Sequence, residues 1–359
     1  MSEEVRAQRS TGARWSLLRN WRIALATANM PSGRVDPVTR WLVLTRAAVQ
    51  PMTITSAAIA GLLAIRKPGF EWGLFALSAL GLILAHAANN LMNDLFDFEA
   101  GADTRDYPRA LYAPHPVLSG MVSARRLTVA AVIVNLLDAM ILAALWVARG
   151  WPVVAFALVG LFISVAYTAP PLRLKKRGLG ELSVFLVWGP LMVGGTYYAA
   201  TGRLSWIVIA ASLPYALLAT SVLMGKHIDK IPWDAPDGTM TLPVLLGERL
   251  ARRVTQGMMA AFYVLLVVLT ATGTLPWPAL VGLVGISRLV AVWKIFNRPK
   301  PDAPPPEYPN YPVWPLWFAA GAFLHTRRAG ALFLLGLLVA AIFSRNGGAE
   351  FDFVFRLRP

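Results

Sequence analysis

The chain has 359 residues, 56% of them hydrophobic, and several long apolar runs carry almost no charge. This composition excludes a soluble domain and predicts an all-α polytopic membrane protein. The formal net charge of +15, from 34 Lys and Arg against 19 Asp and Glu, must therefore lie in loops, where it can face an anionic leaflet or an anionic substrate rather than nucleic acid. The absence of cysteine excludes disulfides, thiolate metal sites and a cysteine nucleophile.

Runs of about 20 apolar residues predict a bundle of about nine transmembrane helices. In chain order they are Thr45–Ile65, Trp72–Met92, Leu127–Val147, Pro152–Tyr167, Leu179–Ala199, Leu204–Met224, Val254–Thr272, Leu275–Phe296 and Arg328–Phe343. A shorter apolar piece, Val313–Leu324, has prolines near its start and is expected to be a half-helix or an extra span. The chain accordingly divides into a basic N-terminal segment (1–44), a membrane domain (45–345) and a C-terminal tail (346–359).

Basic residues alternate between successive loops, which predicts the orientation of the bundle. With the N-terminus inside, the opposite loops hold only Arg66, Lys67, Arg149 and Arg203. Because cytoplasmic loops are enriched in Lys and Arg, we expect an integral protein of the cell inner membrane with a cytoplasmic N-terminus and cytoplasmic loops capping the active site. The pattern weakens after the last span, where Arg345, Arg356 and Arg358 fall outside unless Val313–Leu324 also spans the membrane.

Polar side chains end the second span, in the stretch NNLMNDLFDFEAGAD. Helical spacing places five of them on one face: His86, Asn90, Asn93, Asp94 and Asp97. A polar helix end meeting lipid headgroups is the simplest interpretation of one such aspartate. Carboxylate and amide oxygens one turn apart are, however, typical ligands for Mg²⁺, which also borrows ligands from phosphates.

A second acidic cluster, GKHIDKIPWDAPDG, follows the sixth span on the same side of the membrane. It supplies Asp229, Asp234 and Asp237, with Lys226 before them and Lys230 between the first two. Two facing acidic clusters could bind Mg²⁺ and a diphosphate, whose remaining charge basic side chains would neutralise. The sequence therefore predicts a Mg²⁺–diphosphate site at the cytoplasmic mouth of the bundle, above an apolar cavity for a lipid tail.

A third inner loop, YTAPPLRLKKRGLGE, adds Tyr167, Arg173, Lys175, Lys176 and Arg177. We expect ordinary positive-inside charge for Lys176 and Arg177. Two charged residues inside spans, Asp138 and Arg288, receive no role from the sequence.

These motifs resemble those of the UbiA superfamily of intramembrane prenyltransferases, from about Arg46 to Phe343. The first acidic stretch and the segment YTAPPLRLKKRGLGELSVFLVWGPLMVGGTYYAATG are most similar to 1,4-dihydroxy-2-naphthoate prenyltransferases of menaquinone synthesis. The matching positions are Asn90, Asn93, Asp94, Asp97, Gly101 and Asp103, then Gly178, Gly180, Glu181, Gly189, Gly195, Tyr197 and Tyr198. The chain departs from the family where an arginine usually precedes a Pro-Leu-x-x-Gly step, since APHPVLSG with His115 stands there.

The resemblance implies Mg²⁺-dependent transfer of a polyprenyl group from its diphosphate to an aromatic acceptor. It makes Asp94, Asp97, Asp229 and Asp234 the expected metal ligands, with Asp103 and Asp237 as further candidates and Asn90 and Asn93 as orienting or ligating groups. Lys175, Lys226 and Arg173 would bind phosphate oxygens. Tyr167, Tyr197 and Tyr198 would face the allylic cation, and His86 would bind the acceptor. No protein partner can be inferred.

Three alternatives remain open at this point. An ion-coupled transporter would carry its acidic residues near mid-membrane, whereas here they gather at helix ends. A related prenyltransferase could use 4-hydroxybenzoate, a tocopherol- or chlorophyll-type ring, or a lipid or sugar phosphate as its acceptor. A structural scaffold would leave the two acidic clusters unexplained.

Overall fold

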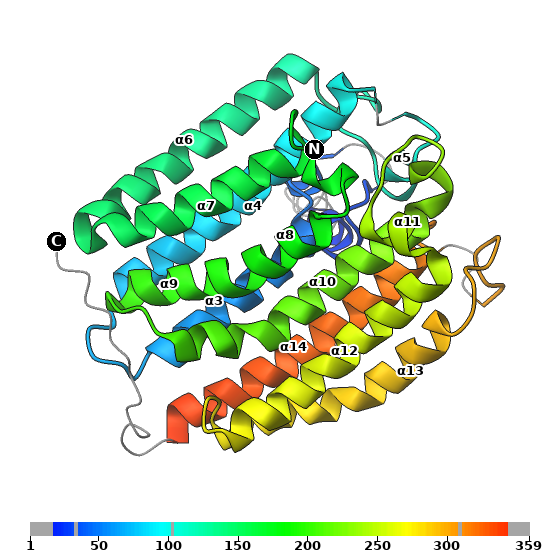
Figure 1. Cartoon of the computed structure of the whole chain (residues 1–359). Coiled ribbons are helices and arrows are strands. Elements are labelled where there is room, and N and C mark those ends of the chain that lie inside the picture. The colour runs from blue at the N-terminus through cyan, green and yellow to red at the C-terminus, as the bar shows by residue number, and fades with distance from the viewer. Residues whose placement is uncertain (1–16, 32–34, 102–103, 308–310, 344–359) are drawn as a thin grey trace, which may run out of the picture.

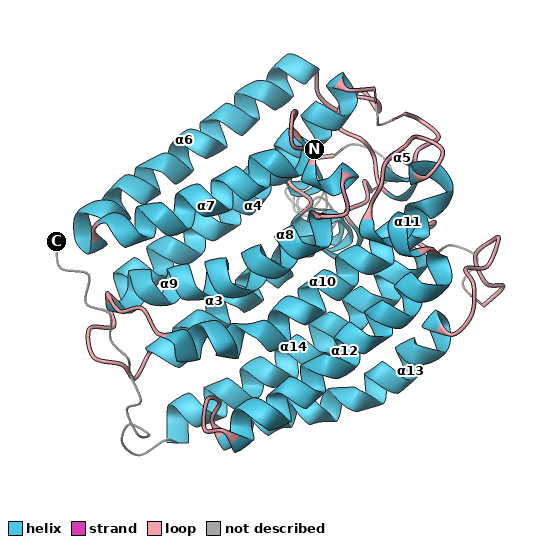
Figure 2. Ribbon diagram, viewed as in Figure 1, coloured by secondary structure: helices cyan, strands magenta, loops and turns pink. Residues whose placement is uncertain are grey.

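A computed structural model of the chain describes residues 17–31, 35–101, 104–307 and 311–343. Over these residues the fold is built from helices joined by loops (Figures 1 and 2). One isolated β-bridge joins Arg177 and Met240. Asp103 and the tail 346–359, including Arg356 and Arg358, lie outside the described residues, as does Arg345.

Nine helices in the described part of the chain are long and apolar enough to cross a membrane, which confirms the predicted number. They are η1–α3 (Ala47–Ala64), α4 (Trp72–Glu99), α6 (Ala124–Arg149), α7 (Trp151–Thr168), α8–η3–α9 (Gly180–Thr201), α10 (Trp206–Asp234), α12 (Glu248–Ala271), η4–α13 (Trp277–Phe296) and α14 (Trp317–Phe343). The short helices α2 (Pro37–Leu44), α5 (Pro108–Tyr112), η2 (Leu174–Lys176) and α11 (Leu242–Leu246) precede or connect them.

The last span differs from the prediction. Val313–Leu324 is neither a half-helix nor an extra span, because its second part forms the first turns of α14, continuous to Phe343. Pro315 explains the boundary, since a proline inside a helix removes a backbone hydrogen bond and the helix begins two residues later. The span thereby gains Arg327 and Arg328 in its interior.

The fifth span is not one regular helix. Its α-helical parts, α8 (Gly180–Leu186) and α9 (Met192–Thr201), are joined by a π-helical turn, η3 (Val187–Leu191), which contains Pro190. Proline lacks the amide hydrogen that a regular helix needs, so the wider turn accommodates it. Ser56 donates a hydrogen bond to the carbonyl of Trp188 within this turn, at 2.6 Å.

The spans form two groups around a cavity. α4 packs against α3 and α6, whereas α10 packs against α12 and α14, and α12 and α13 cover the outside of the second group (Figure 1). α5 and α11 lie together at one end of the bundle, at the ends of α4 and α10 respectively. The N-terminal helix 17–27 and α2 lie against this end, and Ala26, Thr27 and Ala28 line the cavity.

The N-terminus of α14 is held by a carboxylate from α10. Asp229 is buried and accepts hydrogen bonds from the backbone N–H groups of Phe318 at 3.0 Å and Ala319 at 2.9 Å. Gly225 makes the approach possible, because a Cβ there would lie 2.8 Å from the backbone nitrogen of Ala319. Asp229 therefore caps a helix that begins 88 residues later in the chain.

Asp229→Ala is expected to lower the stability of the protein by about 2 kcal/mol, because two backbone donors lose their acceptor. The measurement is the melting temperature of detergent-purified protein. Asp237→Ala is the matched control, since Asp237 is an exposed aspartate beyond the same helix, and it should melt like the wild type. Equal melting temperatures for Asp229→Ala and the wild type would contradict the capping role.

Candidate active site

Two long helices bring the acidic clusters to the same end of the bundle. α4 has 28 residues and α10 has 29, so each is about 42 Å long at 1.5 Å per residue. The hydrocarbon core of a bilayer is about 30 Å thick, so each helix can carry its last turns beyond it. As the second and sixth spans, they point in the same direction and end at the same mouth (Figure 1).

A small polar pocket of about 40 Å³ lies between these helix ends. Most of its lining side chains carry a charge or a hydroxyl group, and five are basic. The lining residues are Arg46, Asn93, Asp97, Tyr107, Arg109, Tyr112, Tyr167, Lys175, Lys226, His227 and Lys230. Such a concentration of cations suits a polyanion.

Asp94 is completely buried beside this pocket and binds two arginines. Arg109 from α5 donates to both of its oxygens, Nε to Oδ1 and Nη2 to Oδ2, each at 2.9 Å. Arg46 also donates to Oδ1. Both oxygens are occupied by arginines, so Asp94, which was expected to be a metal ligand, instead holds α5 and the start of the first span against α4.

The two other acidic groups at the mouth each have a basic partner. Lys175 Nζ donates to both oxygens of Asp97, at 2.8 and 2.9 Å. Asp234 Oδ1 accepts from the hydroxyl of Tyr107 at 2.7 Å and lies 3.3 Å from Lys230 Nζ. Its Oδ2 is buried and has no hydrogen-bond partner among the described residues.

The donor set can be compared with the needs of Mg²⁺. No group of three or more His, Asp or Glu residues in the described ranges is spaced to hold a metal ion by itself. Mg²⁺ commonly takes only one or two carboxylates and completes its coordination with waters and phosphate oxygens. Asp97 lines the pocket, and Asp234 lies buried behind its wall, in contact with the lining residues Tyr107 and Lys230. The carboxylate of Asp97 and the unpaired Oδ2 of Asp234 meet that need. The residues therefore fit a Mg²⁺ held largely by a diphosphate.

The asparagines of α4 join neighbouring helices. Asn90 Nδ2 donates to the carbonyl of Thr45 at 3.0 Å, and Asn93 Oδ1 accepts from Thr168 at 2.6 Å. Asn93 lines the polar pocket and also the cavity beneath it. Both side chains therefore position α4 at the level of the site.

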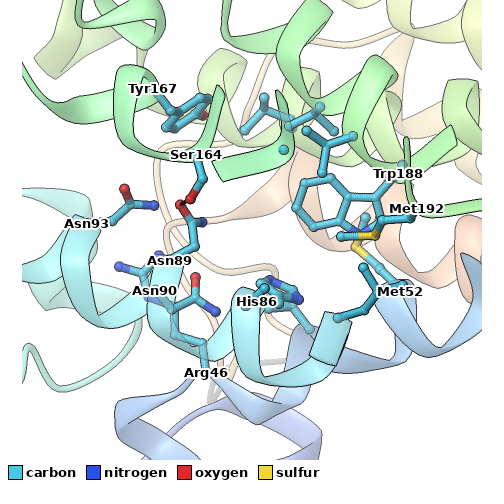
Figure 3. A pocket seen from close by; sticks show the side chains of 18 of the residues that line it. Arg46, Met52, His86, Asn89, Asn90, Asn93, Ser164, Tyr167, Trp188 and Met192 are labelled. Atoms are coloured by element: carbon cyan, nitrogen blue, oxygen red, sulfur yellow. Dashed lines mark hydrogen bonds between the residues drawn. The ribbon is translucent and has the colours of Figure 1, made fainter. Parts of the chain in front are cut away.

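A cavity of about 720 Å³ extends from the polar pocket into the membrane region, with mainly apolar walls. Figure 3 shows His86, Asn89, Asn90 and Asn93 on one side of it. The cavity and the polar pocket have six lining residues in common: Arg46, Asn93, Arg109, Tyr112, Tyr167 and Lys226. We call this shared region the junction.

The pKa of Tyr112 indicates that the electrostatic potential at the junction is positive. Burial opposes ionisation of its phenol, but nearby positive charge outweighs burial and lowers the pKa of Tyr112 below its ordinary value. The cations responsible are Lys226, Arg46 and Arg109. The junction therefore favours negative charge on whatever binds there.

His86 lies deeper on α4 and lines the cavity. Its Nδ1 is 2.7 Å from the hydroxyl of Thr53, and its ring meets that of Trp188 edge-on at 5.2 Å between centroids. These contacts fix the ring orientation. No hydrogen-bond partner for Nε2 is found in the described part of the chain.

Several residues expected at the site lie elsewhere, and these expectations are corrected here. Asp229 caps α14, so its oxygens are already used. Tyr197 is packed in the core, and Tyr198 hydrogen-bonds to the carbonyl of Arg149 at the opposite end of the bundle. Arg173 is exposed and lines neither the pocket nor the cavity. Asp237 is exposed beside Lys176 at 3.6 Å.

Asp138 and Arg288, the two charged residues to which the sequence gave no role, lie in different surroundings. Asp138 lines the cavity, and Gly81 leaves room for it, since a Cβ there would lie 3.2 Å from its Oδ1. Arg288 is exposed and does not line the cavity. An exposed arginine in a span can extend its charged end toward the membrane interface, and the position of Arg288 is consistent with this.

Sequence reasoning gave no site role to Arg46, Arg109, Tyr107 and Tyr112, which lie in segments where basic or aromatic residues are expected anyway. It also gave none to a buried hydrogen bond at the pocket wall, between His227 Nδ1 and Glu181 Oε1 at 2.7 Å. The match of Glu181 to a family motif was a signal for that pair.

The sequence profile of the UbiA prenyltransferase family matches residues 54–314. The chain is 30% identical over 240 residues to a 2-carboxy-1,4-naphthoquinone phytyltransferase of Synechocystis, covering 65% of this chain and 73% of that one. It is 32% identical over 217 residues to a 1,4-dihydroxy-2-naphthoate octaprenyltransferase of Mycobacterium tuberculosis, covering 58% and 70%.

Solved structures share the fold. A UbiA homologue from Aeropyrum pernix has a TM-score of 0.59 at 20% identity, over 80% of this chain and 98% of the other. A homologue from Archaeoglobus fulgidus, solved with GPP and Mg²⁺, has a TM-score of 0.55 at 17% identity, over 82% and 99%. With its nine apolar helices and a match to the family over most of its length, the chain is an integral membrane prenyltransferase that belongs to the UbiA prenyltransferase family.

Proposed function

We propose that the protein transfers a polyprenyl group from its diphosphate to 1,4-dihydroxy-2-naphthoate or a closely similar carboxylated naphthol, with Mg²⁺, in menaquinone synthesis. Relatives named as naphthoate or naphthoquinone prenyltransferases support the acceptor class. We further propose that the site faces the cytoplasm from the cell inner membrane, as the distribution of basic loops suggests. The division into segments 1–44, 45–345 and 346–359 stays a proposal. Segment 1–44 is not functionally separate from the membrane domain, because its residues 26–28 line the cavity.

One observation carries this proposal: a cationic pocket opens directly into an apolar cavity. A prenyl diphosphate has the same division, with a polyanionic head and a hydrocarbon tail. The junction then coincides with the allylic C–O bond that must break. The polar pocket therefore suits the diphosphate head, and the adjoining apolar cavity suits the hydrocarbon tail of the same substrate.

Each proposed head-group residue has a definite task. Lys175, Lys226 and Lys230 would bind the diphosphate, two of them exchanging a carboxylate partner for phosphate oxygens. Asp97 and Asp234 would hold Mg²⁺, which would supply a positive charge to stabilise the leaving pyrophosphate. Arg46 and Arg109 remain with Asp94 and add to the positive potential of the junction.

The cavity below the junction protects the reacting carbon. Ionisation of the C–O bond leaves an allylic cation, which water would trap as an alcohol. Apolar walls exclude water, and the ring of Tyr167, which lines the junction, would stabilise the cation. The ring carbon that bears the carboxylate attacks the allylic carbon, and loss of that carboxylate as CO₂, which leaves its bonding electrons in the ring, restores aromaticity.

Product analysis tests this proposal. Purified protein in detergent is incubated with Mg²⁺, a prenyl diphosphate and either 1,4-dihydroxy-2-naphthoate or 4-hydroxybenzoate, and the products are identified by mass spectrometry. We expect a decarboxylated prenyl naphthoquinol that disappears with EDTA. Prenylated 4-hydroxybenzoate alone would refute the naphthoate acceptor, and the absence of any prenylated product would refute the proposed reaction.

A further inference from the structure

The cavity is lined by two sets of helices, and we name the two parts of its lining by the helices that supply them. α14 packs against α3 and α10, whereas α6 packs against α4 and α7. Cavity-lining residues on α6 and α7 therefore belong to one region, which we call the tail arm. Lining residues on α14, η1 and α3 belong to another, the α14 arm, which contains Val49, Met52, Ala320, Phe323 and Arg327.

Arg327 brings a charge deep into the α14 arm. It lies eight residues beyond Ala319, hence about 12 Å further into the membrane along the helix. Its guanidinium group does not stay at that depth, because its Cζ lies over the ring of Phe323, 5.8 Å from the centroid. Phe323 is one turn closer to the start of α14, so the side chain points toward the junction.

The guanidinium group therefore reaches nearly the depth of Lys226. Ala319 is level with Asp229, to which it is hydrogen-bonded, and Lys226 lies three residues deeper on α10, or about 4.5 Å. Phe323 lies four residues below Ala319, or about 6 Å. An anion between the two arms could be close to both Lys226 and Arg327.

No carboxylate partner for Arg327 exists among the described residues. Its only interaction there is the contact with Phe323. A charged residue inside a membrane span is costly and normally pairs with another group or serves a substrate pathway. The adjacent Arg328 is also exposed but does not line the cavity, so the two arginines differ in what they face.

The charged residues of the two arms indicate which substrate each arm can bind. The tail arm is lined mainly by apolar side chains, such as Leu142, Phe156 and Leu161, which suit a hydrocarbon chain. The carboxyl group of Asp138 disfavours a second negative group there. The α14 arm contains a guanidinium group, which binds a carboxylate with two parallel hydrogen bonds. An anionic aromatic acceptor therefore suits the α14 arm.

We propose that Arg327 is a specificity-determining residue that binds the carboxylate of the aromatic acceptor in the α14 arm. This inference rests on the proposed function and adds the location and anchor of the second substrate. A phospholipid phosphate is chemically similar and could reach the same arginine, so the test must distinguish the two anions.

Direct binding provides the test, with the fluorescence of 1-hydroxy-2-naphthoate and of 1-naphthol as readout in phospholipid-free detergent. We expect Arg327→Leu to weaken binding of the carboxylated ligand about tenfold, the loss expected for a hydrogen-bonded charged group. Binding of 1-naphthol should not change. Arg327→Lys should bind with intermediate affinity, and Arg328→Leu, the matched control, should bind both ligands like the wild type.

Two results would overturn the inference. One is a failure of the binding test: either Arg327→Leu binds 1-hydroxy-2-naphthoate with unchanged affinity, or Arg327→Leu and Arg328→Leu lose affinity for it equally. The other is a change seen only as a melting-temperature shift that depends on added phospholipid, which would assign Arg327 to a lipid phosphate. Turnover measurements separate this inference from the proposed function. If the wild type forms prenylated naphthoate and Arg327→Leu has an unchanged KM for the acceptor, the proposed function holds and the role of Arg327 is refuted.

Discussion

Asp97→Asn is expected to reduce prenyl transfer by about 10²- to 10³-fold, the usual loss when one group that stabilises developing charge is removed. The carboxylate lies at the wall of the polar pocket and binds Lys175 at 2.8 Å. The amide keeps the shape but carries no charge, so it holds Mg²⁺ weakly. The measurement is kcat together with the Mg²⁺ concentration that gives half-maximal rate, which should rise.

Asp237→Asn is the control for this effect. Asp237 belongs to the second acidic cluster, yet its side chain is 58% exposed and lines neither the pocket nor the cavity. The variant should retain wild-type rate and Mg²⁺ dependence. Full activity of Asp97→Asn, or equal losses in both variants, would exclude Asp97 as a metal ligand.

Arg109→Ala should destabilise the protein by about 3 kcal/mol, as expected when one partner of a buried ion pair is removed. Asp94 would lose two hydrogen bonds of 2.9 Å in a completely buried position. Because Arg46 remains, we expect the lower end of the range for such losses. The measurement is thermal unfolding of the purified variant in detergent.

Arg105 provides the comparison, since it lies four residues earlier in the same loop and is exposed. Arg105→Ala should unfold like the wild type. Arg109→Lys should be intermediate, because lysine retains the charge but cannot donate to both oxygens in parallel. If Arg109→Ala is as stable as Arg105→Ala, the ion pair with Asp94 contributes nothing.

The spans could be predicted because hydrocarbon thickness imposes a length on apolar runs. Helical periodicity likewise placed Asn93 and Asp97 on the same face of α4, where both now line the polar pocket. Such arguments concern neighbours along one helix. They do not identify the helix that a given face meets.

Asp229 shows this limit. Its position in an acidic cluster favoured metal binding, but its partners are backbone groups of Phe318 and Ala319, far along the chain. Similarly, the roles of Arg46 and Arg109 depend on meeting a buried carboxylate, whereas in the sequence they resemble ordinary positive-inside charge. Their assignment required three-dimensional packing.

Photoaffinity labelling tests the central claim most directly, namely that one prenyl diphosphate spans the polar pocket and the apolar cavity. The probe is a prenyl diphosphate with a benzophenone at the tail end, and mass spectrometry locates the labelled residues. We predict Mg²⁺-dependent labelling within the tail arm, on α6 or α7, that pyrophosphate suppresses. Labelling confined to lipid-facing residues, or unaffected by Mg²⁺ and pyrophosphate, would contradict the account.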